Sequence, residues 1–92
     1  MENSHNIEPL LNRYVDRLKA ELNDVDTYNT MYESLKANGL YEDAATIERI
    51  ARDEYNHAKI LWYILKEHGR DVSSDIEIAH LWSKAKSAFH IA

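Results

Sequence analysis

The chain has 92 residues, 45% of them hydrophobic and 29% charged, with a formal net charge of −5, so it forms one small domain and is too apolar to be disordered. It contains no cysteine, which excludes disulfides, thiolate catalysis, iron–sulfur clusters and cysteine-based zinc sites. The acidic balance works against general nucleic-acid binding, and no apolar run approaches the roughly 18 residues of a membrane span.

The first expected helix begins near Asn6 or Glu8 and ends near Asn38. Pro9 is tolerated in the opening turn because its missing N–H would be unsatisfied there anyway, and Gly39 is a natural left-handed terminator. Apolar residues recur at every seventh position in two rows, and one acidic residue interrupts the second row. The rows are Leu11, Leu18, Val25 and Tyr32, and Tyr14, Glu21, Tyr28 and Leu35.

The second expected helix runs from about Tyr41 to His68 and is terminated by Gly69 in the same way. Two ionisable residues, Glu54 and His57, interrupt apolar rows that are otherwise built from isoleucine and leucine. The rows are Ile47, Glu54 and Leu61, and Ile50, His57 and Ile64. Because these rows follow the helical repeat, the pattern predicts that both ionisable side chains are buried.

A connector over residues 70–73 leads to the third expected helix, which runs from about Asp75 to His90. Residues 74–77, Ser-Asp-Ile-Glu, have the capping-box pattern at its start. The apolar residues of this segment are spaced for one helical face. They are Ile78, Leu81, Trp82, Ala85 and Phe89.

The short turn between the first two helices forces them to lie antiparallel as a hairpin. One short third helix cannot cover the apolar stripe that this hairpin leaves open, and Ala44, Ala51 and Ala58 would let a neighbouring helix approach closely. We therefore expect an all-α fold with a single domain over residues 1–92, made of a helical hairpin over 7–69 and a C-terminal helix over 74–90. Two copies are expected to pair as a four-helix bundle homodimer.

Glu21, Glu54 and His57 are expected to form a metal site, because a buried carboxylate is normally protonated, paired or bound to a cation. Residues three apart on a helix share a face, and Glu21 lies at the matching depth of the antiparallel first helix. Two copies would supply four Glu and two His, the ligand set of di-iron and di-manganese bundles. Two divalent ions would neutralise the four carboxylates, and such oxygen-rich ligands suit iron or manganese better than zinc.

Three segments, Glu21–Tyr28, Lys36–Leu40 and Arg52–Ala58, resemble the first helical pair of a rubrerythrin, in the ferritin-like superfamily. The chain also resembles the short encapsulated ferritins, whose single hairpin builds a di-iron site between two subunits. The resemblance implies a ferritin-like domain with two Fe ions per dimer, bound by Glu21, Glu54 and His57. It further implies that Glu54 bridges the ions and that these three residues form a catalytic site for oxidation of Fe(II).

Two other functions are considered beside this ferroxidase-like one. Rubrerythrins carry four helices in one chain and often a cysteine-rich domain that delivers electrons, whereas this sequence has three expected helices and no cysteine. Rubrerythrin-like peroxide scavenging would therefore need an external electron donor. The alternative without catalysis is a helical dimerisation module whose buried polar layer sets the register of the dimer.

The expected partners are further copies of this chain, as a homodimer or a higher oligomer built from dimers. An external electron donor and an encapsulating shell are the other partners that the family resemblance leaves open, and neither nucleic acid nor a membrane is expected. Residues 1–5 lack the charged and apolar regions of a signal peptide, so a cytoplasmic location is expected.

Overall fold

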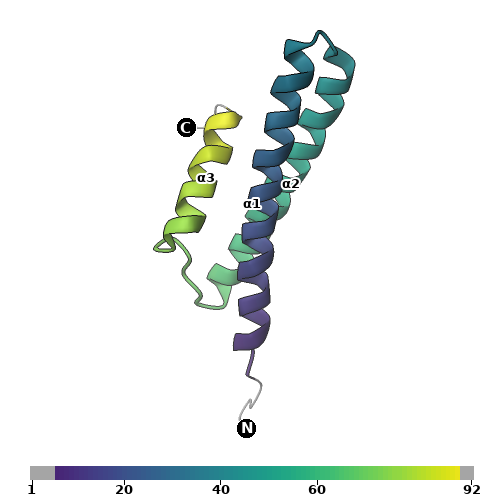
Figure 1. Cartoon of the computed structure of the whole chain (residues 1–92). Helices are drawn as coiled ribbons and strands as arrows, with labels where there is room; N and C mark the ends of the chain where they lie inside the picture. Colours follow the sequence, from purple (N-terminus) through teal and green to yellow (C-terminus); the bar gives the residue numbers. More distant parts are fainter. Residues whose placement is uncertain (1–5, 90–92) are drawn as a thin grey trace.

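Three helices make up most of the computed structural model, which describes residues 6–89. They are α1 (Glu8–Ala37), α2 (Tyr41–Glu67) and α3 (Ile76–Ala88), and no strand occurs between residues 6 and 89. The all-α prediction is therefore confirmed, and the three helices lie where the sequence pattern placed them (Figure 1). The expected end of the third helix at His90 and the signal-peptide argument on residues 1–5 lie outside the described residues.

Both long helices end at a glycine with the same hydrogen-bond pattern. Gly39 and Gly69 each have φ 77°, a left-handed conformation that glycine adopts without steric cost. After α1, the N–H of Leu40 donates to the carbonyl of Leu35 at 2.9 Å, and the N–H of Gly39 donates to Lys36 at 3.1 Å. This is the Schellman arrangement, and it reverses the chain so that α1 and α2 run antiparallel.

The start of α3 differs by one residue from the capping-box prediction. Asp75, not Ser74, is the N-cap residue, and its carboxylate accepts a hydrogen bond from the N–H of Ile78 at 3.1 Å. The Nζ atom of Lys19 on α1 lies 3.5 Å from Asp75 Oδ2 and 3.2 Å from Glu77 Oε1. These two contacts connect the acidic turn at the start of α3 to α1.

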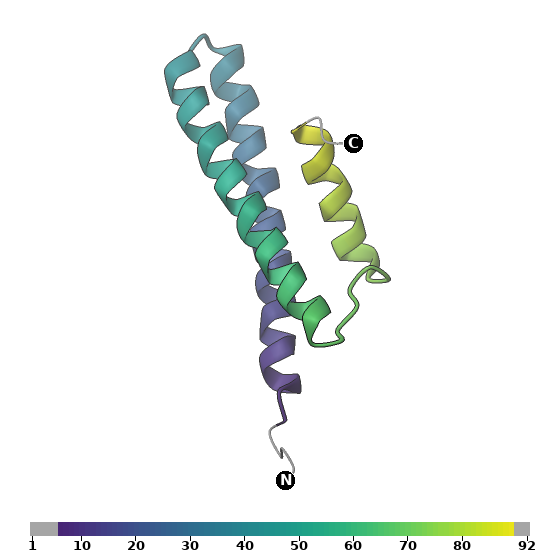
Figure 2. The same cartoon turned by 180° about the vertical axis from the view of Figure 1, so that it is seen from behind.

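α3 folds back along the hairpin and packs its apolar stripe against α1 and α2 (Figures 1 and 2). The Tyr55 ring on α2 lies 5.6 Å from the Trp82 ring and 5.5 Å from the Phe89 ring, measured between centroids. Both views show that α3 ends well below the hairpin turn. The molecule is consequently elongated, with extents of 61 × 21 × 17 Å. Within residues 6–89, no third layer covers the part of the hairpin near the turn.

The buried side of α2 is not the one that its leucine and isoleucine rows predicted. The alanine row Ala44, Ala51 and Ala58 is at most 2% exposed, because side chains this small let α1 approach closely. The predicted rows are instead half-buried in a band that runs along both helices of the hairpin, here called the open face. Its apolar members are Tyr14, Tyr28, Leu35, Ile47, Ile50, Leu61 and Ile64.

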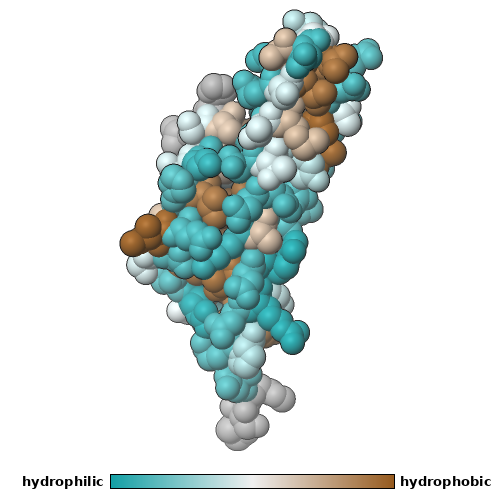
Figure 3. All heavy atoms as spheres, in the orientation of Figure 1, coloured by the Kyte–Doolittle hydropathy of each residue, from teal (hydrophilic) through white to brown (hydrophobic). Residues whose placement is uncertain are grey.

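Further apolar side chains are exposed around the hairpin turn. Met31 is 41% exposed and Leu40 is 49% exposed, and Figure 3 shows hydrophobic side chains gathered on this upper part of the molecule. None of the helices within residues 6–89 is long and apolar enough to cross a membrane.

Candidate metal centre

Glu21 is the buried charged residue of the described chain, with 6% of its surface exposed. It lies in the middle of α1, beside the fully buried Leu18, Leu22 and Val25. Burial of a carboxylate among apolar side chains costs several kcal/mol unless a proton, a counter-ion or hydrogen-bond donors compensate it. The surroundings of its two oxygens therefore decide what this residue does.

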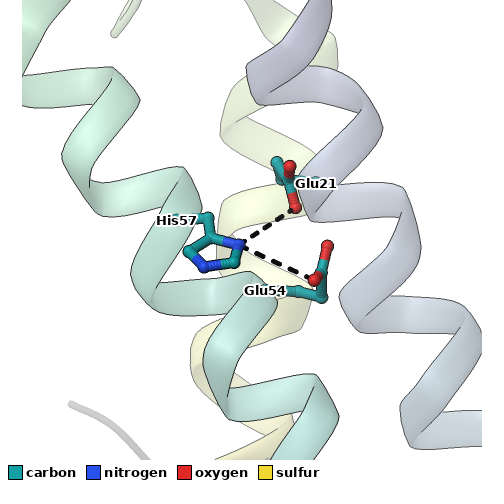
Figure 4. Close-up of side chains that lie close together, drawn as sticks. All are labelled: Glu21, Glu54 and His57. Carbon is teal, nitrogen blue, oxygen red and sulfur yellow. Dashed lines mark ion pairs between the residues drawn. The ribbon is translucent and has the colours of Figure 1, made fainter.

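Glu54 and His57 project from α2 toward Glu21, and Figure 4 shows the three side chains facing one another across the hairpin. His57 Nδ1 lies 3.7 Å from Glu54 Oε1 and 3.8 Å from Glu21 Oε2. One ligand atom from each residue lies within 4.8 Å of the others. The structure thus brings together all three residues that the sequence predicted as metal ligands, with donor atoms close enough to contact a common cation.

The two oxygens of Glu21 have different surroundings. Oε1 accepts a hydrogen bond from the guanidinium of Arg17, one turn earlier on α1. Oε2 is buried and accepts no hydrogen bond from the residues that the structure describes while Glu54 is ionised. A buried oxygen without a donor normally marks a bound water, an ion or a shared proton. Since Oε2 faces His57, it lies on the side where a metal bound by these residues would sit.

The two carboxyl groups titrate as a pair. Hydrogen bonding to Glu21, followed by burial, raises the pKa of Glu54 to about 7. Burial also acts to raise the pKa of Glu21, but hydrogen bonds with Glu54 and Arg17 outweigh it and hold this pKa below its usual value. Below neutral pH the pair therefore keeps one proton, on Glu54, and a cation that binds both carboxylates has to displace that proton.

The predicted burial is correct for Glu21, only partly correct for Glu54 and wrong for His57. The Glu54 side chain is 20% exposed and that of His57 is 56% exposed. Both lie on the open face, which the other helices cover in part at Glu54 and leave exposed at His57. The heptad rows identified three residues that lie close together, but they could not show which rows of α2 a single chain leaves without a neighbour.

Arg17 is the residue of this site that the sequence interpretation missed. Its contact with Glu21 follows the i, i+4 spacing at which side chains meet on a helix. The available signal was therefore a basic residue one turn before a predicted ligand.

The family model described as Rubrerythrin matches residues 16–88. This range includes all four residues of the site, the whole of α2 and α3, and all of α1 except its start. The chain belongs to the rubrerythrin family. The match confirms the resemblance that the sequence analysis noted. The ferritin-like helical fold is thus supported by both the family match and the structure. No curated protein and no solved structure matches the chain significantly.

Rubrerythrin domains generally bind iron, and the residues of this family member suit that metal. Two carboxylates and one imidazole form an oxygen-rich ligand set that matches the preferences of iron and manganese. Glu21 Oε2 is buried without a hydrogen-bond partner, and a bound cation would take the place of one. The side chains present therefore fit a metal ion of this kind.

Proposed function

We propose that this chain is a di-iron carboxylate protein that binds iron between two copies of itself and oxidises Fe(II). Glu21, Glu54 and His57 are the residues that would hold the ions. The observation that carries the proposal is the convergence of three ligand atoms within 4.8 Å, on a face that the single chain leaves partly exposed.

The proposal needs two copies because one chain supplies an incomplete site. A single trio offers three side chains, the buried Glu21 and, on the open face, Glu54 and His57. An iron or manganese ion in a helical bundle takes more oxygen ligands than these. A two-fold partner seated on the open face would bring a second trio and would cover the half-buried isoleucine and tyrosine side chains around it. Four carboxylates would then balance the charge of two divalent ions.

In this proposal the substrate is Fe(II) and the oxidant is molecular oxygen. Two Fe(II) ions become Fe(III), and one oxygen molecule takes up the two electrons and two protons to become hydrogen peroxide. The carboxylates bind and orient the ions, and the proton held by Glu54 leaves as the ions bind. The apolar side chains of the open face, once paired, keep bulk water away from the site.

Anaerobic loading with Fe(II) tests the proposal. The purified protein is expected to take up about one iron per chain, and admission of air is expected to produce the near-ultraviolet absorbance of ferric iron. Glu54→Ala should abolish both. Asp53→Ala removes the same charge from the exposed neighbouring residue and should preserve both. Iron uptake that survives Glu54→Ala would contradict the proposed site.

The Arg17–Glu21 ion pair favours a second candidate, a dimerisation module without catalysis. An arginine and a shared proton can satisfy these carboxylates without a metal, and a polar layer can set helix register. Under this alternative the protein forms dimers but takes up no iron.

A third alternative is peroxide scavenging with an external electron donor. The rate of Fe(II) oxidation is therefore measured with hydrogen peroxide and with air, and faster oxidation by air supports the ferroxidase-like reaction.

A further inference from the structure

Arg17 connects the surface of α1 to the buried carboxylate of Glu21. Its guanidinium Nη2 pairs with Glu21 Oε1, while the Arg17 side chain is 59% exposed and that of Glu21 is 8% exposed. An ordinary surface ion pair contributes little, because both partners remain hydrated. Here one partner has lost most of its water, so the arginine provides the charge compensation that Glu21 needs in the absence of metal.

The same contact occupies an atom that a metal centre would use. Oε2 of Glu21 is free of donors within the described chain and faces His57, whereas Oε1 is held by Arg17. A carboxylate that binds one ion with both oxygens, or contacts two ions, needs Oε1 as well. Arg17 and a metal ion therefore compete for the same carboxylate.

Deprotonation cannot end this competition, because a guanidinium keeps its charge over the whole pH range in which proteins are folded. An incoming divalent ion must either displace Arg17 from Glu21 or bind beside it against charge repulsion. In both cases the arginine weakens metal binding while it stabilises the metal-free chain.

We propose that Arg17 is a built-in counter-ion that holds Glu21 in the metal-free protein and is exchanged for the metal ion, so that this residue sets the metal affinity of the site. The inference rests on the function proposed above and assigns a regulatory residue to that same site. Arg17 acts through Glu21 as a positioning residue and needs no contact with oxidant or iron.

The test compares Arg17→Gln with the unmodified full-length protein. Gln keeps a polar group at the end of the side chain but removes the charge. Arg13→Gln is the matched control, because Arg13 is an exposed arginine one turn earlier on the same helix. Each protein is titrated with Co²⁺ as an air-stable probe of the site, and binding is followed by visible absorption. Circular dichroism of the metal-free proteins then gives their thermal midpoints.

Removal of a competing charge at this distance should tighten Co²⁺ binding by about tenfold or more. Arg17→Gln is also expected to lower the thermal midpoint of the metal-free protein, and saturating Co²⁺ should restore it. Arg13→Gln should change neither quantity appreciably, because its charge is farther from Glu21.

Equal or weaker Co²⁺ binding by Arg17→Gln would overturn the inference, and so would an unchanged or raised thermal midpoint without metal. In these cases the unmodified protein still binds Co²⁺, so the proposed metal site is not contradicted. If neither the unmodified protein nor Arg17→Gln binds Co²⁺, the proposed metal site itself is wrong and the inference falls with it.

Discussion

Glu21 shows how far a single residue can be interpreted from sequence. Its place in an apolar row of seven-residue spacing predicts burial, and the structure confirms it with 6% exposure. The same spacing selected Glu54 and His57 and so identified the residues that converge. It could not identify the Arg17 contact, because many exposed arginines have an acidic residue four positions away and only burial of Glu21 makes this one important.

The raised pKa of Glu54 predicts a pH dependence for the stability of the metal-free protein. The folded state, with a pKa of about 7 against a usual 4.5, binds the proton more tightly than the unfolded chain does. Stability should therefore fall as pH rises from 4.5 to 7, because the unfolded state binds fewer protons throughout this range. Urea unfolding across this range measures the effect.

Glu54→Gln is the control for this pH dependence. A glutamine cannot titrate, so the decline between the two pKa values should largely disappear in the variant. The lowered pKa of Glu21 acts in the opposite direction and at lower pH, below its usual value. A decline of the same size in Glu54→Gln would show that another group is responsible.

Metal binding should release a proton at mildly acidic pH. Glu54 retains its proton below pH 7 in the metal-free state, and a carboxylate must lose it to bind a cation. Calorimetric titration with Mn²⁺ in two buffers of different ionisation enthalpy gives the number of protons released. That number should be about one per chain at mildly acidic pH and should approach zero well above neutral pH. Release that does not vary with pH would contradict the assignment to Glu54.

The helices are the elements that local sequence determines best. Both glycine terminators lie at the predicted positions, since left-handed backbone at a helix end is a property of single residues and their neighbours. The N-cap of α3 is one residue later than the capping-box pattern predicts, because Ser74 and Asp75 are both good caps. Asp75 also contacts Lys19 on a different helix, and no local pattern contains that contact.

Asp75→Ala should destabilise the protein by about 1 kcal/mol, because it removes the side chain that accepts from Ile78 N–H. Asp75→Asn should retain most of this stability, since asparagine caps equally well, and the difference between them separates capping from the Lys19 ion pair. Ser74→Ala should be nearly neutral. Chemical denaturation measures all three, and a larger loss for Ser74→Ala than for Asp75→Ala would restore the original capping-box prediction.

At the scale of the whole molecule the open face is the feature that calls for a partner. Ferritin-like sites in bundles use ligands from facing helices. In this chain Glu21 is buried, whereas Glu54 is half-buried and His57 is exposed on the open face. The homodimer remains a prediction, supported by the half-buried apolar side chains around the site and by the incomplete ligand set.

Ile50→Glu should break the proposed dimer and with it metal binding. The side chain is half-buried on the open face, and a dimer would enclose the introduced charge at a cost of several kcal/mol. Ile76→Glu makes the same change on α3, at a residue that is 85% exposed, and should preserve both. Sedimentation velocity measures the mass, with circular dichroism as the check on folding. A dimeric Ile50→Glu protein with normal Co²⁺ binding would contradict this interface.

The amino-acid sequence by itself determined the three helices, their terminators and the identity of the three converging side chains, because helical repeat, capping and glycine signals are all local. Only the tertiary structure decided which side of α2 is covered. That choice depends on contacts between segments far apart in the sequence. The small alanines let α1 approach closely, and Trp82 of α3 and Phe89, directly after α3, pack on Tyr55. For the same reason, only the folded chain showed that His57 is exposed and that Arg17 compensates Glu21.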